Sequence, residues 1–128
     1  MSKEKLEYYF VYGTLKRGWG NNKIFQTSPT AKFIEEAVTE PKFDLYHLGG
    51  FPGVRENGET AVHGEIWSVS DEHTKRKLDM LEGYYRESPK DGMYDKKKII
   101  VNNKEVNIYL INRLVTQDKQ IKTGIWER

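Results

Sequence analysis

Two stretches of this sequence hold residues whose types and spacing could do chemistry. The first, FVYGTLKRGWGNN at residues 10–22, interrupts a run of strand-forming residues at Gly13. A glycine directly after a buried strand exposes backbone N–H groups, and such groups can bind a carboxylate or a developing oxyanion. A glycine turn is also a common exit from a strand, so this loop alone leaves both interpretations open.

The loop matches neither of the familiar nucleotide-binding patterns. Gly13 and Gly18 have the separation found in a Walker motif, but Trp19 and Gly20 stand where Lys and Ser or Thr belong. The dinucleotide fingerprint is excluded as well, because it needs a helix that opens on the glycines.

The second stretch, SDEHTKRKLDMLEG at residues 70–83, predicts a helix. Ser70 suits the N-cap position and Gly83 suits the stop. Asp71 and Glu72 lie in the first turn, where the helix dipole favours anions.

Glu82 lies at the margin of the apolar face of this helix. At 100° per residue, Leu78 and Leu81 define the buried stripe, and Glu82 falls only about 40° from Leu78. Partial desolvation and the negative helix end both raise the pKa of a carboxyl there, which suits proton transfer near neutrality. The alternative is a solvated glutamate at a helix end. The other long polar side chains of the helix are expected to point toward solvent: Lys75, Arg76 and Asp79.

Together with FPGV at residues 51–54 and VHGEIWSV at residues 62–69, these stretches resemble the γ-glutamylcyclotransferase-like family. The resemblance is closest to the short branch that includes the γ-glutamylamine cyclotransferases, and it spans about residues 9–109. It implies that the YGTL stretch binds substrate through its backbone and that the glutamate of the LD..E piece is the general acid/base. By position, the binding residues are Tyr12, Gly13, Thr14 and Leu15, and the acid/base is Glu82.

The activity that the resemblance implies suits these residue types. In a γ-glutamyl amide the α-amine can attack the γ-carbonyl of its own chain, which releases 5-oxoproline and a free amine. Such a reaction needs no serine or cysteine nucleophile, and no metal or other cofactor is expected. The expected partner is a small γ-glutamyl compound, with no nucleic acid, membrane or obligatory protein partner.

One departure from the family concerns its Tyr-x-Arg, which commonly starts the strand after the glutamate. Here Tyr94-x-Lys96 has lysine in place of arginine, and Tyr85-Arg86 is the alternative. Lysine lacks the planar fork with which arginine binds a carboxylate. The resemblance implies that Tyr94 and Tyr109 also line the pocket. At position 109 an ordinary core tyrosine is equally expected.

Around these residues the sequence predicts an α+β fold. We expect a single domain over residues 1–128, with a mixed, strongly curved or barrel-like β-sheet and few helices. Residues 49–54 are expected to form a loop, because Pro52 lies among three glycines. Strands are expected over residues 7–12, 31–39 (where a helix also fits), 42–48 and 61–70, with a hairpin over 96–111 that turns at Asn102-Asn103-Lys104.

Three further positions carry structural expectations. Gly64 is expected to mark a bulge or a close approach within its strand. The C-terminal tail is expected to dock through Ile125 and Trp126, and Trp19 is either a lid over the pocket or a packed anchor.

Composition excludes several function classes. The 21 cations and 19 anions nearly cancel, which gives no strong attraction to nucleic acid or membrane. The chain has no cysteine, so disulfides, thiolate metal sites and cysteine nucleophiles are excluded. No apolar run approaches the roughly 18 residues of a membrane span and no signal peptide is recognisable, so we expect a cytoplasmic protein. His47, His63 and His73 lie on different predicted elements without metal-ligand spacing.

Two alternatives from other classes stay open. A family-fold protein without activity could serve as a binding protein. A small curved sheet could instead stack and neutralise single-stranded nucleic acid. The aromatic and cationic residues for that second alternative are Tyr8, Tyr9, Trp19, Tyr84, Tyr85, Lys16, Arg17 and Lys96–Lys98.

Overall fold

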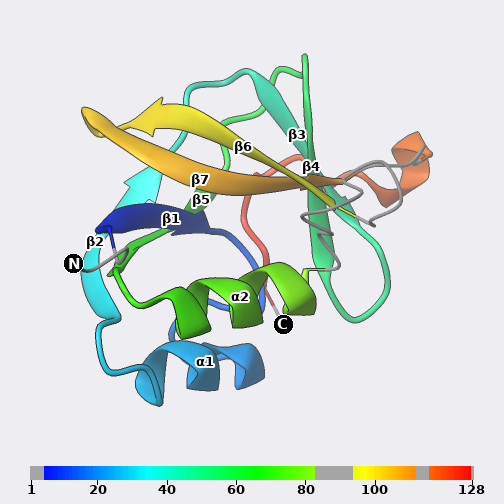
Figure 1. The fold of residues 1–128 in the computed structure, drawn as a ribbon. Coiled ribbons are helices and arrows are strands. Elements are labelled where there is room, and N and C mark those ends of the chain that lie inside the picture. The colour runs from blue at the N-terminus through cyan, green and yellow to red at the C-terminus, as the bar shows by residue number, and fades with distance from the viewer. Residues whose placement is uncertain (1–4, 83–93, 112–115, 128) are drawn as a thin grey trace.

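The computed structural model describes residues 5–82, 94–111 and 116–127, and it confirms the predicted α+β fold (Figure 1). None of the described helices is long and apolar enough to cross a membrane. The strands are β1 (Glu7–Val11), β2 (Lys32–Val38), β3 (Phe43–His47), β4 (Pro52–Glu56), β5 (His63–Val69), β6 (Tyr94–Val101) and β7 (Lys104–Ile111). The helices are the short α1 (Lys23–Gln26) and α2 (Glu72–Leu81), with 3-10 turns at Gly20–Asn22 and Gln117–Lys119.

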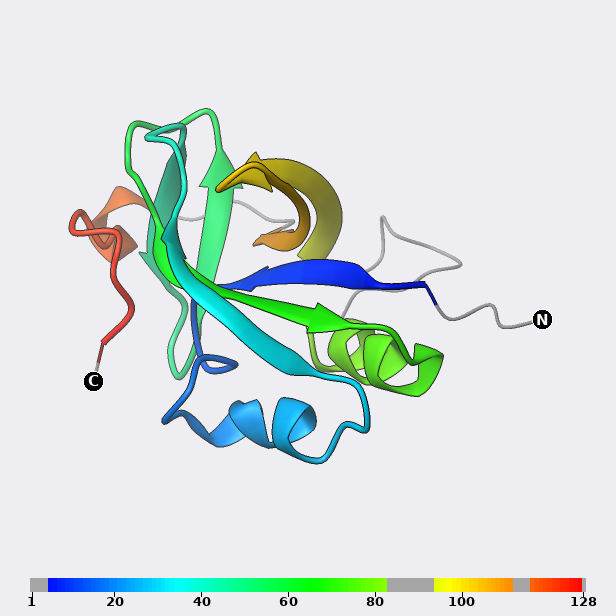
Figure 2. The ribbon, with the colours of Figure 1, turned by 90° about the vertical axis from the view of Figure 1, so that its left-hand side faces the viewer.

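A mixed five-stranded sheet in the order β2-β5-β1-β7-β6 is the framework, and β3 and β4 pair as a separate two-stranded sheet. Strand β1 lies at the centre, antiparallel to β5 and parallel to β7. Figure 2 shows the strong curvature of the larger sheet. Helices α1 and α2 lie together beneath it, opposite the arching β6–β7 hairpin (Figure 1).

Strand β1 is buried on both faces, as its unbroken apolar run predicts. Phe10 packs in the core between the large sheet and the β3–β4 sheet, together with Leu45 and Val54. Tyr9 and Val11 pack on the opposite side, in the core that includes Phe25 of α1 and Leu78 of α2. Tyr9 is only 1% exposed, so it cannot serve as a stacking platform for nucleic acid bases.

The prediction of a loop over residues 49–54 is wrong for its second half, because β4 begins at Pro52. Pro52 is the first residue of its strand, a position where the missing N–H is tolerated. Two residues later, Val54 pairs with Leu45 of β3, and both side chains are fully buried. This apolar pairing outweighs the local turn signal of the glycines.

Other predictions about the strands are confirmed. Residues 31–39 contain β2, and the β6–β7 hairpin forms with Asn102 and Asn103 at φ angles of 52° and 63°. Two successive positive φ angles are what a two-residue hairpin turn requires. Gly64 is a close-approach point, because a Cβ there would lie 2.4 Å from the carbonyl oxygen of Val11.

The N-terminus of α2 differs from the prediction by one residue. The N-cap is Asp71 rather than Ser70, and its carboxylate accepts a 2.9 Å hydrogen bond from the N–H of Thr74. An aspartate reaches the N–H of the third helical residue from this position in the usual capping geometry. The expected stop at Gly83 lies outside the described residues.

The buried face of α2 is more charged than its periodicity predicts. Lys75 and Asp79 are buried rather than exposed, because each finds an ionic partner on the sheet. Lys75 Nζ lies 3.2 Å from Glu7, and Asp79 lies 3.0 Å from Lys96 Nζ. Leu81, expected in the buried stripe, is exposed instead.

The C-terminal tail docks as expected. Trp126 is 5% exposed, and its ring centroid lies 5.7 Å from that of Trp19 and 5.1 Å from that of His47. Lys16 Nζ donates a 3.0 Å hydrogen bond to the Trp126 carbonyl. Trp19 is therefore a packed anchor for the tail.

The Asp71 cap generates a prediction about stability. Ser28, Thr30 and Thr74 donate hydroxyl hydrogen bonds to its carboxylate. Burial alone would raise the pKa of Asp71, but these hydrogen bonds outweigh burial and hold the pKa at about 2, below the ordinary 3.8. Asp71→Ala should lower the free energy of unfolding by about 0.5–2 kcal/mol, as measured by urea denaturation at neutral pH.

The pH dependence of this loss follows from the depressed pKa. The stabilisation is present above the ordinary pKa of 3.8 and is lost as the pH falls toward about 2, so parent and variant should converge there. Glu72→Ala removes the neighbouring, more exposed carboxylate and is the matched control. It should change the free energy by only a few tenths of a kcal/mol. Equal losses in both variants would contradict the prediction.

Candidate active site

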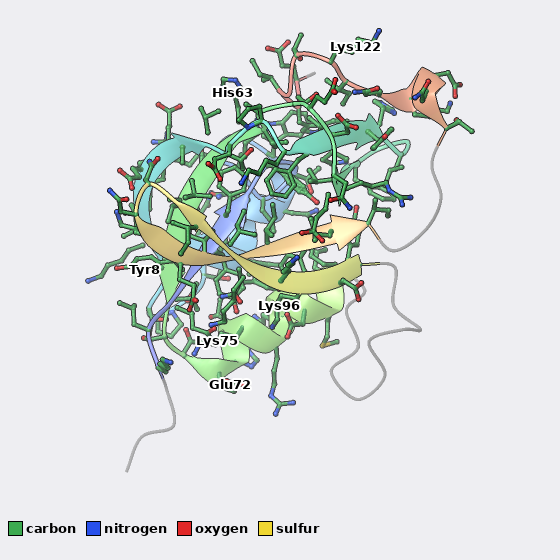
Figure 3. The ribbon with its side chains drawn as sticks, turned by 90° about the horizontal axis from the view of Figure 1, so that it is seen from above. Tyr8, His63, Glu72, Lys75, Lys96 and Lys122 are labelled. Carbon is green, nitrogen blue, oxygen red and sulfur yellow. The ribbon has the colours of Figure 1, made fainter. Side chains whose placement is uncertain are left out.

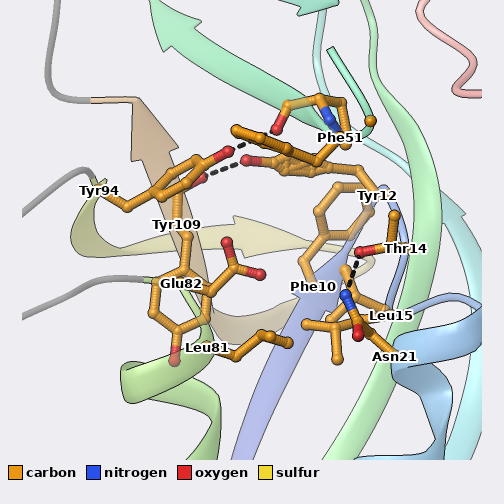
Figure 4. Close-up of a pocket in the computed structure, with 14 residues that line it drawn as sticks. Phe10, Tyr12, Thr14, Leu15, Asn21, Phe51, Leu81, Glu82, Tyr94 and Tyr109 are labelled. Atoms are coloured by element: carbon orange, nitrogen blue, oxygen red, sulfur yellow. Dashed lines mark hydrogen bonds between the residues drawn. The ribbon is translucent and has the colours of Figure 1, made fainter. Parts of the chain in front are cut away.

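A cavity of about 380 Å³ opens where β1 ends (Figure 4). Its walls come from the loop after β1, the start of β4, the end of α2, and strands β6 and β7. It gathers every binding and acid/base residue predicted from the sequence: Tyr12, Gly13, Thr14, Leu15, Glu82, Tyr94 and Tyr109.

Among the described residues that line the cavity, Glu82 is the only acidic one, and none is a lysine, an arginine or a histidine. It is the C-cap residue of α2, and Figure 4 shows its carboxylate directed into the cavity beside the Tyr109 ring. Burial raises the pKa of Glu82 from 4.5 to about 7, in the direction expected from the sequence. A carboxyl with this pKa can both accept and return a proton near neutrality.

The tyrosines around Glu82 use their hydroxyls to bind protein groups. Tyr12 donates a 2.7 Å hydrogen bond to the Tyr109 carbonyl, and Tyr94 donates a 2.6 Å hydrogen bond to a carbonyl of β4. Tyr109 donates a 2.6 Å hydrogen bond to Asp79. Burial raises the pKa of Tyr12 and of Tyr109 well above the usual range, and nearby ionisable groups raise both further. These two phenols therefore stay neutral at the pH where Glu82 titrates.

The loop after β1 is fastened to its surroundings at several points. Glu65 of β5 accepts hydrogen bonds from the Arg17 N–H at 3.0 Å and from Arg17 Nε at 3.1 Å. Asn22 Nδ2 donates a 2.7 Å hydrogen bond to the Leu15 carbonyl. Leu15 itself is 3% exposed and packs into the core on the helix side. A loop held in this way keeps its backbone N–H groups in place, which anion binding requires.

Asn21 is a polar pocket residue to which the sequence assigned no role. Its Nδ2 donates a 2.8 Å hydrogen bond to Thr14 Oγ1, and both side chains line the cavity. Only its position in a loop rich in glycine and asparagine could have pointed to it. The amide sets the direction of the Thr14 hydroxyl and adds a hydrogen-bond donor to the cavity wall.

The close approach at Gly13 is made by the protein itself. A Cβ there would lie 2.4 Å from Cγ and 2.7 Å from Cδ of Pro52. The missing side chain lets the first residue of β4 pack directly on the loop after β1. Gly13 thus joins two walls of the cavity.

The structure describes one of the two candidate segments for the Tyr-x-Arg of the family. Tyr94 begins β6 and lines the cavity, and Lys96 contacts Asp79, while Tyr85-Arg86 lies outside the described residues. Within the described part of the chain, no group of three or more His, Asp or Glu side chains could hold a metal ion.

Comparisons with known proteins identify the family. The family model described as "Gamma-glutamyl cyclotransferase, AIG2-like" matches residues 9–128. The chain belongs to this family. A Vibrio cholerae protein named "Putative gamma-glutamylcyclotransferase" is 45% identical over 73 residues, which are 57% of this chain and 59% of that protein. A Methanocaldococcus jannaschii protein of the same description is 38% identical over 85 residues, which are 63% of this chain and 68% of that one.

A solved structure extends the match to almost the whole chain. The solution structure of ytfP from Escherichia coli is 30% identical, has a TM-score of 0.67, and covers 93% of this chain and 95% of its own. The likeness to this structure supports the α+β fold over almost the whole chain.

The packing at Gly13 generates a prediction about stability. Because Pro52 occupies the space of a Cβ, Gly13→Ala should lower the free energy of unfolding by about 1–3 kcal/mol, besides any effect on activity. The measurement is urea or thermal denaturation. Gly20→Ala is the matched control in the same loop, since nothing lies within 4 Å of its Cβ position, and it should be close to neutral. A fully stable Gly13→Ala variant would contradict the packing argument.

Proposed function

We propose that this protein is a γ-glutamyl cyclotransferase in which Glu82 is the general acid and base and 5-oxoproline is the product. The observation that carries the proposal is the Glu82 carboxyl, whose pKa is raised to about 7 in a cavity with otherwise uncharged described walls. Membership of the family supports the class of reaction.

No described cationic side chain in the cavity wall can bind the α-carboxylate of the γ-glutamyl substrate. The groups that could donate hydrogen bonds to it are the backbone N–H groups over residues 13–15 and the amide of Asn21. One N–H of Asn21 Nδ2 is used by Thr14, and the second N–H on that nitrogen can still donate. These groups also suit the oxyanion that forms on the γ-carbonyl during attack.

The proposed reaction transfers protons through one carboxyl. Ionised Glu82 takes a proton from the donor's α-ammonium, and the freed amine attacks the γ-carbonyl carbon. The new C–N bond closes a five-membered ring as the C–N bond of the amide breaks, and Glu82 returns its proton to the departing nitrogen. After ring closure the attacking nitrogen still carries one proton too many, and Glu82, ionised again, removes it and passes it to the released amine. Of the three protons on the ammonium, one therefore stays on the ring nitrogen and two leave with the amine. The nucleophile belongs to the substrate, so folding the donor into the attacking pose provides a high effective molarity.

Apart from Glu82, the described walls of the cavity carry no charged side chain, which favours donors whose leaving group has no carboxylate next to the scissile nitrogen, as in γ-glutamylamines. A matched pair tests this: γ-glutamyl-propylamine and γ-glutamyl-2-aminobutyrate, which differ by that one carboxylate. We expect kcat/KM for 5-oxoproline release to be about tenfold or more higher for the propylamine, because the second carboxylate would be desolvated without a partner. Equal or reversed values would contradict the amine preference.

Glu82→Gln tests the acid/base role. Glutamine keeps the size of the side chain but cannot accept a proton, so turnover should fall by about 10²–10⁴-fold while donor affinity stays near the parent value. The measurements are 5-oxoproline release and equilibrium binding of the donor. Glu72→Gln, the same substitution at the other end of α2, is the control and should keep full turnover. Normal turnover in a folded Glu82→Gln variant would overturn the proposed mechanism.

The same variant has a signature in stability. The folded-state pKa of Glu82 is raised from 4.5 to about 7, so ionisation destabilises the folded parent as the pH rises through that range. Glu82→Gln should match the parent in thermal stability near pH 4.5 and should be more stable than the parent above about pH 7.

A further inference from the structure

The C-terminal tail, residues 116–127, is bound to the sheets by backbone hydrogen bonds. The N–H of Ile121 donates a 2.7 Å hydrogen bond to a carbonyl of β3, and the Gly124 carbonyl accepts a 2.9 Å hydrogen bond from the N–H of His63, the first residue of β5. Figure 3 shows His63 and Lys122 of the tail on the same side of the molecule. These contacts fix the course of the residues that follow in the tail.

Trp126 of the tail packs against two segments that lead into walls of the cavity. Its ring centroid lies 5.7 Å from that of Trp19 and 5.1 Å from that of His47. Trp19 belongs to the loop after β1, and His47 ends β3 just before the β3–β4 turn at residues 48–51. Trp126 is buried, but it is not among the described residues that line the cavity.

The contact with Trp19 continues through hydrogen bonds to the first wall. Lys16 Nζ donates a 3.0 Å hydrogen bond to the Trp126 carbonyl. The N–H of Lys16 binds the Gly13 carbonyl at 3.0 Å, and the N–H of Trp19 binds the Lys16 carbonyl at 3.1 Å. Trp126 therefore supports, from outside the cavity, the turns that present the backbone N–H groups over residues 13–15.

The contact with His47 leads to another wall. The Nδ1 atom of His47 accepts a 3.1 Å hydrogen bond from the N–H of Gly49, and the N–H of Leu48 donates a 2.9 Å hydrogen bond to the Phe51 carbonyl. Phe51 lines the cavity. The imidazole that packs on Trp126 is thus part of the turn that carries this cavity residue.

We propose that Trp126 is a positioning residue of the site, which keeps the loop after β1 and the β3–β4 turn at their separation across the cavity. This inference rests on the proposed function. Trp126 does not touch the substrate in this proposal and acts through Trp19 and His47. Because Glu82 comes from α2, outside these two segments, loosening them should weaken donor binding and orientation without changing the titration of Glu82.

The aromatic ring of Trp126, rather than its N–H group, is the part that matters. The Nε1 atom is buried, and no described residue accepts a hydrogen bond from it. Phenylalanine would keep an aromatic ring between Trp19 and His47 and would remove the unpaired buried donor. Trp126→Phe should therefore preserve the positioning, whereas Trp126→Ala should abolish it.

Steady-state kinetics of the full-length protein, with γ-glutamyl-propylamine as the donor, provide the first test. Trp126→Ala should raise KM and lower kcat/KM by about tenfold or more, and Trp126→Phe should stay within about threefold of the parent. The apparent pKa on the acid limb of the kcat profile should be the same in all three proteins. Val106→Ala truncates a fully buried side chain at the start of β7 and is the control for general loss of stability. It should keep the parent's KM at a temperature where every variant is folded.

Amide hydrogen exchange followed by NMR provides a second test that does not depend on turnover. In Trp126→Ala, the N–H groups of Lys16, Trp19 and Leu48 should exchange about tenfold faster relative to those of β1, and Trp126→Phe should restore the parent's rates.

A milder variant answers the question if Trp126→Ala does not fold. Lys16→Met removes the side-chain hydrogen bond to the Trp126 carbonyl and leaves the ring contacts in place. It should raise KM and speed the exchange of the loop N–H groups in the same direction. Lys23→Met removes an exposed cation a short distance along the chain, and it should change neither.

The outcomes distinguish this inference from the proposed function. Parent-like KM and loop exchange in folded Trp126→Ala, or in Lys16→Met where the alanine variant does not fold, would overturn the inference. Equal changes in Val106→Ala, or a phenylalanine variant as impaired as the alanine one, would also overturn it. Faster loop exchange and a raised KM, both restored by phenylalanine, would support it. Full turnover by Glu82→Gln would overturn the proposed mechanism, while loop exchange would still report whether Trp126 holds the two segments.

Discussion

The site depends on the burial of β1 on both of its faces. Tyr9 and Val11 pack toward the helices and Phe10 packs toward the β3–β4 sheet, so a slip of one residue would exchange the two sets. Pairing with β5 on one side and β7 on the other fixes the register further. The strand therefore ends at a defined place, and the backbone that follows it is delivered to the point where the end of α2 and strand β7 also arrive.

Two carboxyls at opposite ends of α2 show how strongly local surroundings decide chemistry. Asp71 at the N-cap receives hydroxyl and N–H donors that outweigh its burial, and its pKa falls to about 2. Glu82 at the C-cap lies against the apolar cavity, and burial raises its pKa to about 7. The first arrangement stabilises the fold at neutral pH, whereas the second costs stability there. A protein retains a feature of the second kind where a carboxyl that can exchange protons is useful.

Much of this could be predicted from the sequence, because strand alternation, the Asn-Asn turn and the helix margin at Glu82 are local signals. Strand β4 could not, since the pairing of Val54 with Leu45 lies outside any local window and overrides the turn signal at Pro52. Asp79 was misplaced for a similar reason. Helical periodicity treats a charged residue as solvent-facing, but its partners Lys96 and Tyr109 come from strands that follow the helix in the chain. Asn21 gave no signal beyond its position in a loop rich in glycine and asparagine.

In the proposed reaction, the described walls of the cavity, which carry no charged side chain besides Glu82, have two linked effects. They raise the pKa of Glu82, which lets one carboxyl act first as base and then as acid. They also provide no cationic side chain, among the described lining residues, for a second carboxylate on the leaving group. A cation added to bind such a carboxylate would stabilise ionised Glu82 and weaken it as the acid that protonates the departing nitrogen. Donor preference and proton transfer are then two consequences of one electrostatic property, and a change in one should be accompanied by a change in the other.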